Sequence, residues 1–498
     1  MNPEERRIES MAETEWGPLQ PVLALLAQED GVAEGVLDRK QSDASLVRAL
    51  GSEELTAAVK AASLEQMDAA LAHDALAVER KPLSFLLLLS AKAAKVEHWH
   101  ARRLTADVQL QYAAASASLL LQISRFFCQV PAVVAAKEIK KGRLSVLCAQ
   151  YAALAVDLRQ SVKAIFPLKS FLRRFHQQGH TVLTPLHAQF FYLCLQAKCY
   201  FAAMEVLDQY VRYPSLSIHS QPHLVTCVDF LGYAYYGGLL YLGEKRYQEA
   251  LDLFLLAITA PAVSLSAFVI EAYKKLVLVT LIQRGETVLL PKYTPFVVTR
   301  HVENHCTAYV DLANAFAVKK DVAAAVEIAT KFEHEFAKDG NLGLVKQSVQ
   351  ALKQRKLLQL TRTYATIELA EMTTAAGMVY SDAVAAEKML LALISTGQMA
   401  AVLDKQKAMV RFVLEDEEDD EQQDVSHGEA TRQLQKEMEK LVLVASQLRY
   451  MDVELVTSAK FQSRQQKDKD RRSRLSMHNQ QGDDHVAFDG ASGMDTME

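Results

Sequence analysis

The chain has 498 residues, half of them hydrophobic, and its formal net charge is −5. A chain of this length can bury several cores, and its low content of glycine (19) and proline (12) favours a helix-rich protein. The slight excess of acidic residues argues against a nucleic-acid binder. The charged N-terminus predicts no secretory signal, and the most apolar run, Phe85 to Leu89, is too short to cross a membrane.

The six cysteines stand singly in apolar helical sequence, and none forms a Cys-x-x-Cys pair. Isolated cysteines in such a setting are usually small buried hydrophobes, whereas zinc and redox motifs need paired thiols. We therefore expect reduced core thiols in a protein of the cytoplasm and nucleus.

The first third of the chain predicts amphipathic helices. Apolar residues recur at helical spacing over Val22–Leu26, Ser45–Leu50 and Leu55–Leu76. Pro82 followed by the apolar run Leu83–Leu89 predicts a helix that begins at the proline and is buried on most sides.

From Leu183 onward the predicted helices form pairs. The segment from Phe230 to Pro261 is similar to a tetratricopeptide unit, with small residues where the helices meet, an aromatic residue, Phe254, four positions after Ala250, and a terminal proline. Turns recur about every 35 to 45 residues, which is the period of a helical solenoid.

Between Gly343 and Glu415 the periodicity changes. A helix ending at Arg362 is followed by a β-branched, aromatic segment that predicts a strand, and then by two short helices. Two alternating segments around Asp404–Lys407 predict a β-hairpin. This order of elements is that of a winged helix. The predicted elements are Leu344–Arg362, Thr363–Ile367, Leu369–Ala376, Ser381–Gly397, Ala400–Leu403 and Met409–Val413.

The seven acidic residues Glu415–Glu421 repel one another and predict a solvated linker. A final helix begins near Glu429, and its apolar residues follow the 4-3 rhythm of helices that pack on other helices. We therefore predict six parts: N-terminal helical repeats (1–182), tetratricopeptide-like repeats (183–343), a winged helix (344–414), an acidic linker (415–428), a C-terminal helix (429–462) and a disordered tail (463–498).

The sequence contains no glycine-rich nucleotide motif, P-loop or nucleophile elbow. His98 and His100 have the spacing of a zinc isopeptidase motif, but Val108 stands where that motif needs serine. His301 and His305 would lie one helical turn apart, yet a structural zinc site needs four ligands. We expect no catalytic residue, no metal and no cofactor.

A winged helix can also bind DNA. The helix that would enter the groove, Ser381–Gly397, has the single cation Lys388 against Asp382 and Glu387, whereas recognition helices present several cations or amides. The acidic run that follows would repel phosphate. Protein binding is therefore the favoured use of this module, and we expect neither nucleic-acid nor membrane partners.

Helical repeats that end in a winged helix are the layout of PCI-domain scaffold proteins. Several stretches make this chain similar to the subunit 3 family of the COP9 signalosome, a PCI-domain scaffold family, over roughly residues 182–414. These stretches are Leu186–Ala188, Leu193–Cys199, Tyr235–Gly238, Ala257–Ala262, Glu271–Lys275, Leu290–Thr294, Asn341–Gln347, Leu360–Tyr364 and Ala386–Lys388.

The resemblance implies a non-catalytic scaffold. The signalosome removes the ubiquitin-like protein Nedd8 from cullins and so regulates cullin-RING ubiquitin ligases, and its zinc active site lies on a different subunit. The resemblance implies PCI and MPN subunits as direct partners and cullin-RING ligases as partners through the complex. The alternatives are a PCI scaffold of the proteasome lid and a nucleic-acid-binding PCI adaptor.

Two surfaces are candidate interfaces. We expect the second hairpin strand to be an edge strand that pairs with a neighbouring PCI subunit, and the last helix to enter a shared helical bundle. The wing edge comprises Val402, Leu403, Val410, Phe412 and Val413. The C-terminal seam comprises Leu434, Met438, Leu441, Ala445, Leu448 and Leu455.

Overall fold

The computed structural model of the protein describes residues 62–72, 78, 82–100, 106–177, 183–210, 225–375, 383–395, 397–404 and 408–412, together with parts of a helix between residues 431 and 467. The helices predicted at Val22–Leu26 and Ser45–Leu50, the start of a helix at Ser381, the acidic linker and the tail beyond Lys467 lie outside these residues.

The chain divides into two compact units. The first comprises Met1–Leu360 and Ala370–Leu391, and the second comprises Thr361–Leu369 and Ala392–Glu498. Within the described residues, no single helix is both long and apolar enough to cross a membrane. The segments Tyr112–Gln129 and Ala132–Lys140 meet those criteria only as a pair that is bent by 115°.

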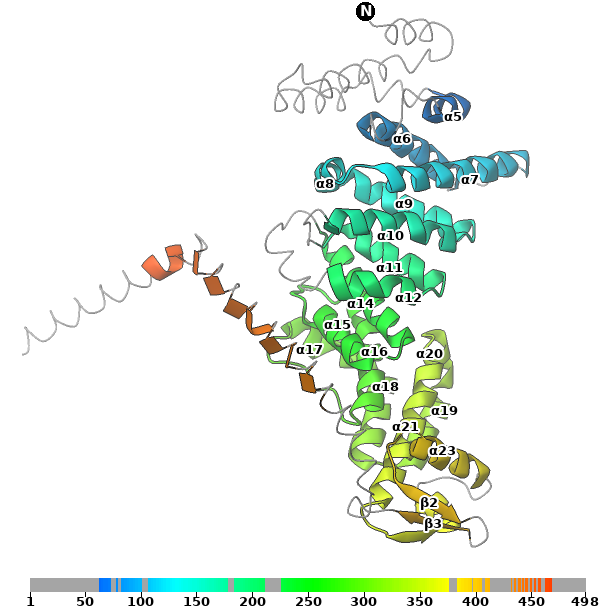
Figure 1. Cartoon of the computed structure of the whole chain (residues 1–498), viewed down its shortest axis with the longest axis vertical. Coiled ribbons are helices and arrows are strands. Elements are labelled where there is room, and N and C mark those ends of the chain that lie inside the picture. The colour runs from blue at the N-terminus through cyan, green and yellow to red at the C-terminus, as the bar shows by residue number, and fades with distance from the viewer. Residues whose placement is uncertain are drawn as a thin grey trace, which may run out of the picture. The chain divides into compact units, whose positions relative to one another are not determined.

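The first unit is a stack of helices, which confirms the predicted helical-repeat class. Successive helices pack on one another, and Figure 1 shows them as consecutive layers from α5 to α16. The first helices of the stack are α5 (Leu64–Ala72), α6 (Pro82–His100), α7 (Ala106–Gln129), α8 (Ala132–Lys140), α9 (Arg143–Asp157), α10 (Ser161–Gln177), α11 (Pro185–Gln196), α12 (Phe201–Glu205) and the π-helical turn η3 (Val206–Tyr210).

The stack continues through the predicted tetratricopeptide-like region. The long helix α21 packs on α16 and α19, so the last described helices of this region close back on the repeat before them. The further elements are α14 (Cys227–Gly243), α15 (Tyr247–Thr259), α16 (Ala267–Gln283), α17 (Phe296–His301), η4 (Glu303–His305), α18 (Thr307–Ala313), η5 (Asn314–Lys319), α19 (Val322–Lys331), α20 (Glu333–Lys338) and α21 (Leu342–Leu360).

Helix boundaries follow local sequence chemistry. Helix α6 begins at Pro82, as predicted, because a proline at the first helical position lacks only an N–H that would have no helical partner. Helix α5 begins after Ser63, whose hydroxyl accepts from the N–H of Gln66 while the Gln66 side chain accepts from the N–H of Ser63. This Ser-x-x-Gln capping box is a sequence signal for the start of α5.

Helices α14 and α15 approach each other closely. A Cβ atom added to Gly238 would lie 2.5 Å from a ring carbon of Phe254, which is fully buried. The sequence predicted small residues at this contact and an aromatic residue on α15, and the structure pairs these two positions. Only glycine leaves room for the ring.

A histidine pair joins α10 to α11 in the core of the first unit. The backbone N–H of Thr184 donates to Nδ1 of His187, so the proton of neutral His187 lies on Nε2, which is 2.9 Å from Nε2 of His176. Burial, and then repulsion by His176, lowers the pKa of His187 to about 3. The two imidazole rings therefore join α10 to α11 through a hydrogen bond between their Nε2 atoms.

The second unit contains a three-stranded antiparallel sheet of order β1-β3-β2. Strand β2 (Ala401–Asp404) pairs with β3 (Met409–Phe412) as the predicted hairpin, and β1 (Thr366–Glu368) pairs with the other side of β3. The predicted first strand began at Thr363, three residues before β1. Helices α22 (Leu369–Ala375) and α23 (Ala383–Ser395) lie between β1 and β2 in sequence, and most of their residues belong to the first unit.

The prediction that the second hairpin strand is an edge strand is wrong. Strand β3 is the central strand, because β1 pairs with the side of β3 that β2 leaves open. The residues of β1 lie 41 to 45 positions before their partners on β3. Among the residues that the structure describes, the edge strands of the sheet are therefore β1 and β2. The hairpin alone could not reveal this, since the strand that covers β3 is distant in sequence.

The structure corrects two further expectations, one about a histidine pair and one about the cysteines. His301 ends α17 and His305 ends the separate turn η4, so they do not lie on one continuous helix. The thiols of Cys148, Cys194 and Cys306 are buried, but Cys227 is exposed at the start of α14. Core burial is thus wrong for Cys227.

Candidate partner-binding surfaces

The predicted wing edge divides into exposed and buried residues. Val402 on β2 is 59% exposed and Leu403 is half-buried, whereas Val410 and Phe412 on β3 are 0% and 5% exposed. Val413 lies outside the described residues. Val410 and Phe412 are therefore core residues of the sheet, and the part of the predicted surface that a partner can reach is β2.

The hydrogen-bond pattern identifies which β2 residues present free backbone groups. The backbone N–H of Phe412 donates to the carbonyl of Ala365, on the β1 side of β3. The backbone N–H and C=O groups of successive residues point to opposite sides of a strand, so those of Arg411 face β2. Arg411 lies opposite Val402, so the N–H and C=O of Val402 face β3. Successive residues of a strand alternate, and the corresponding groups of Ala401 and Leu403 point away from the sheet.

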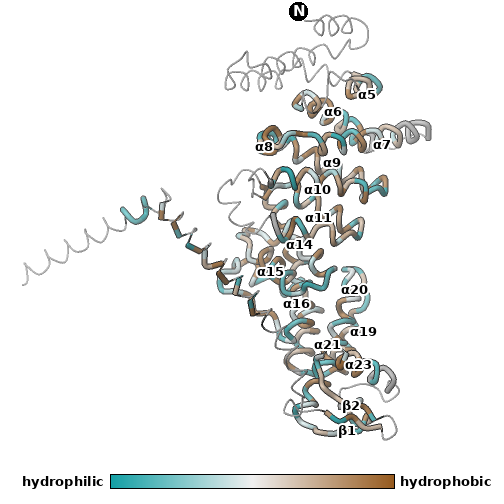
Figure 2. Tube along the Cα trace, viewed as in Figure 1, coloured by the Kyte–Doolittle hydropathy of each residue, from teal (hydrophilic) through white to brown (hydrophobic). Residues whose placement is uncertain are grey.

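The C-terminal seam is exposed along its described length. Every described residue of the helix between residues 431 and 467 is exposed, and Figure 2 shows apolar residues recurring along it. Leu455 lies outside the described residues. Residues 462–467 are also helical, so helix is present up to five residues beyond the predicted end. The large apolar seam residues are Leu434 (64% exposed), Met438 (61%), Leu441 (68%) and Leu448 (58%).

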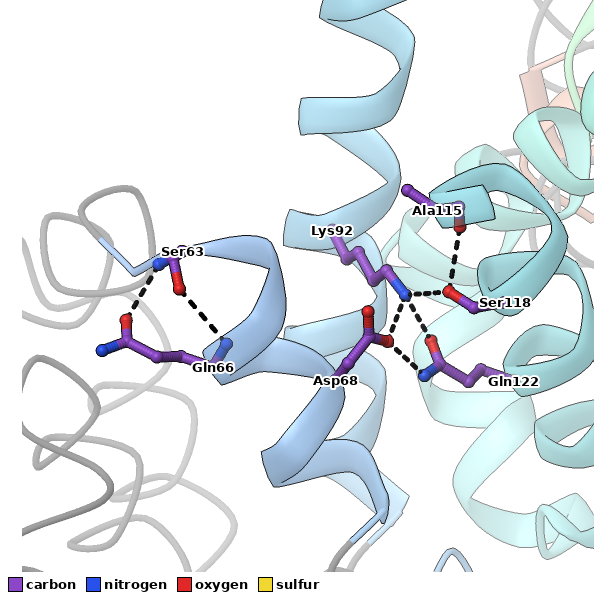
Figure 3. Close-up of polar contacts among 7 residues, drawn as sticks. All are labelled: Ser63, Gln66, Asp68, Lys92, Ala115, Ser118 and Gln122. Atoms are coloured by element: carbon purple, nitrogen blue, oxygen red, sulfur yellow. Dashed lines mark hydrogen bonds and ion pairs between the residues drawn. The ribbon is translucent and has the colours of Figure 1, made fainter. Parts of the chain in front are cut away.

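A buried lysine joins the first helices of the stack. The Lys92 side chain is fully buried on α6, and its ammonium group pairs with Asp68 of α5 and donates to Ser118 (2.7 Å) and Gln122 (3.0 Å) of α7, as Figure 3 shows. Gln122 in turn donates to the Asp68 carboxylate at 2.6 Å. Burial lowers the pKa of Lys92, and the hydrogen bond and charge of Asp68 oppose that effect. The cluster fixes three helices in register.

A second polar cluster fixes the end of the stack. The ammonium group of Lys275 on α16 donates to the side-chain oxygen of Asn341, which precedes α21. The Asn341 amide donates to the Tyr309 hydroxyl on α18 at 2.8 Å, and that hydroxyl donates to Asp339 at 2.7 Å. Lys274 also pairs with Asp339 at 2.8 Å. Two of the stretches singled out in the sequence, Glu271–Lys275 and Asn341–Gln347, thus meet here.

Neither polar cluster has the composition of an active site. Each lysine is engaged by acceptors from other segments of the stack, and the clusters join those segments. Among the residues that the structure describes, no group of three or more His, Cys, Asp or Glu side chains could hold a metal ion. The candidate functional sites of the described chain are therefore its exposed surfaces.

Comparison with known families covers most of the chain. The family model of the COP9 signalosome complex subunit 3, N-terminal helical repeats, matches residues 45–298. The PCI-domain model matches residues 329–413. The two matches follow the order of the helix stack and the sheet.

Two curated relatives carry the same description. The chain is 29% identical over 340 residues to COP9 signalosome complex subunit 3 of Dictyostelium discoideum, an alignment that covers 68% of this chain and 77% of the relative. It is 36% identical over 266 residues to COP9 signalosome complex subunit 3 of Arabidopsis thaliana, which covers 53% of this chain and 58% of the relative.

Proposed function

This chain belongs to the subunit 3 family of the COP9 signalosome, and we propose that its role there is that of a non-catalytic scaffold subunit. It contributes to the complex that removes Nedd8 from cullins and thereby regulates cullin-RING ubiquitin ligases. The observation that carries this function is the match of residues 45–298 to the helical-repeat family model, followed by the PCI match at residues 329–413.

A second and more specific proposal concerns the direct partners of this chain. We infer that other PCI and MPN subunits of the signalosome contact this chain and that cullin-RING ligases reach it only through the complex. A location in both cytoplasm and nucleus is part of the same proposal. The exposed strand β2 and the exposed C-terminal seam support direct contacts with protein partners, since unpaired strand edges and apolar helix faces are common protein-binding surfaces.

Affinity purification of the full chain from its own cells, followed by mass spectrometry, tests the function. We expect the remaining signalosome subunits in near-equal amounts, with cullins present at lower occupancy. A tagged, unrelated helical-repeat protein is the control for nonspecific capture. Recovery of proteasome-lid subunits, or of messenger-RNA export factors, in place of signalosome subunits would contradict the proposal.

The free edge of β2 is proposed as the wing contact. A strand from a partner would pair with the outward N–H and C=O groups of Ala401 and Leu403. Leu403→Pro removes one outward N–H without removing a hydrogen bond of the β2–β3 ladder, and an edge strand tolerates proline at such a position.

Leu403→Ala is the matched control, because it shortens the same side chain but keeps the N–H. We expect Leu403→Pro to reduce recovery of partner subunits in co-purification clearly more than Leu403→Ala does, while both variants fold. Equal recovery with the two variants would exclude backbone pairing at this edge.

A further inference from the structure

The loop between α16 and α17, together with the start of α17, exposes three large apolar side chains within eight residues. Leu289 is 89% exposed, and Tyr293 and Phe296 are each 72% exposed. Isolated apolar residues are common on protein surfaces, but aromatic and aliphatic residues gathered in one short segment are typical of binding sites. We call this segment, residues 288–300, the α17 surface.

The α17 surface is held in place by its buried neighbours. Val288 and Leu290, on either side of Leu289, pack against the core of the first unit. Thr294 is buried beside the exposed Tyr293, and its N–H donates to the carbonyl of Pro291 at 3.0 Å. The alternation of buried and exposed residues anchors the backbone of this segment, so a partner does not have to order that backbone when it binds.

The charges of the α17 surface have one sign. Residues 287–302 contain no Asp or Glu, and the exposed Lys292 lies between Leu289 and Tyr293 in sequence. The guanidinium carbon of Arg300 lies 5.8 Å from the ring centroid of Phe296. The nearest acidic residues in sequence, Glu286 and Glu303, act electrostatically on Arg355 and Tyr273 of the protein's own helices.

A short segment with exposed apolar side chains and the exposed cations Lys292 and Arg300 is complementary to an apolar segment that carries carboxylates. We propose that the α17 surface is a docking site for an acidic, apolar segment of another signalosome subunit. This inference rests on the proposed function, since it assumes that the chain is assembled with other subunits. The inference adds a third proposed contact, on the helical repeats, to those proposed for the edge of β2 and the C-terminal seam.

Site-specific photo-crosslinking of the reconstituted complex tests the inference. The full chain carries benzoylphenylalanine in place of Phe296, and a second version carries it in place of Phe201, which is 82% exposed at the start of α12 and serves as the matched control. Co-purification of the other subunits is measured first in both versions. Crosslinked peptides are then identified by mass spectrometry.

We expect position 296, and not position 201, to crosslink to one segment of another subunit in which apolar residues alternate with Asp or Glu. In a chain that also carries Lys292→Glu and Arg300→Glu, the crosslink yield should fall about tenfold, which corresponds to about 1.4 kcal/mol, because the reversed charges would repel the carboxylates of the partner. Both substituted side chains are exposed, so the fold should be retained.

Several outcomes would overturn the inference while leaving the scaffold function intact. These are an assembled complex without a crosslink from position 296, a crosslink to a segment without acidic residues, a crosslink to a second copy of this chain, and a yield that charge reversal does not change. Failure of the unsubstituted chain to co-purify with the other subunits would instead reject the proposed function, and this inference with it.

Discussion

Helix α14 and the C-terminal helix both carry large apolar side chains, but these side chains have opposite surroundings. Helix α14 buries most of its length, including Tyr233 and Leu240, between α11 and α15. In the C-terminal helix the seam residues Leu441 and Leu448 are 68% and 58% exposed. An apolar helix within the repeats is covered by its neighbours in sequence, whereas the last helix presents the same kind of face to solvent. The repeats thus stabilise this chain, and the last helix is available to stabilise an assembly.

The largest stability effect is expected where a buried charge would lose its partner. Asn341→Leu leaves the buried ammonium group of Lys275 without its side-chain acceptor, which should cost about 3–5 kcal/mol in the free energy of unfolding. Lys275→Met removes the charge itself and should cost about 1–3 kcal/mol. Urea denaturation of both variants measures these costs.

The double variant Lys275→Met with Asn341→Leu is the control for this pair. Because it leaves no unpaired buried charge, it should be more stable than Asn341→Leu alone. Strictly additive losses would show that the two side chains are not coupled, contrary to the contact in the structure.

The next largest effect is expected at the α14–α15 contact. Gly238→Ala places a Cβ atom 2.5 Å from the Phe254 ring and should cost about 1–3 kcal/mol through overpacking. Gly232→Ala, in the same helix, would meet its nearest atom at 3.6 Å, an ordinary contact. This control should be neutral or stabilising by up to about 1 kcal/mol, because alanine favours helices over glycine. Equal thermal midpoints for the two variants would contradict the close approach of Gly238 to Phe254.

The histidine joint should make the repeats sensitive to acid. The pKa of His187 in the folded protein is about 3, below its ordinary value of 6.5, so the unfolded chain binds a proton first as the pH falls. The contribution of this residue is fully present above pH 6.5 and is lost between about pH 6.5 and 3, by up to about 1.4 kcal/mol per pH unit.

His187→Gln removes this titration and should flatten the pH dependence of urea unfolding over that range. The exposed His305 provides the comparison, and His305→Gln should leave the slope as it is in the unsubstituted protein. If His187→Gln keeps the original slope, the acid sensitivity arises elsewhere.

The smallest stability effect is expected in the C-terminal helix. Leu441→Asp with Leu448→Asp alters two side chains that are already exposed, so the thermal midpoint of the isolated chain should be nearly unchanged. The same variant should lose subunits from the purified complex, because a partner would have to bury two carboxylates. A large fall in the midpoint of the isolated chain would mean that the helix packs on its own chain, and the comparison with α14 would fail.

Sequence periodicity determined much of this architecture. The start of α6 at Pro82, the α14–α15 pair with its small residues opposite Phe254, and the β2–β3 hairpin all depend on residues that are close in sequence. Local propensity, capping and the spacing of apolar residues specify such elements directly. The 4-3 pattern likewise predicted a continuous apolar face on the C-terminal helix, whose described residues are exposed.

The contacts between segments that are distant in sequence were determined only by the tertiary structure. The pairing of β1 with β3 moved Val410 and Phe412 from a predicted interface into the core, and it left β2 with a free edge. The contact between Lys275 and Asn341, 66 residues apart, likewise has no local signature. Periodicity shows which face of an element is apolar, but only the folded chain determines whether that face meets another part of the same molecule or remains open to a partner.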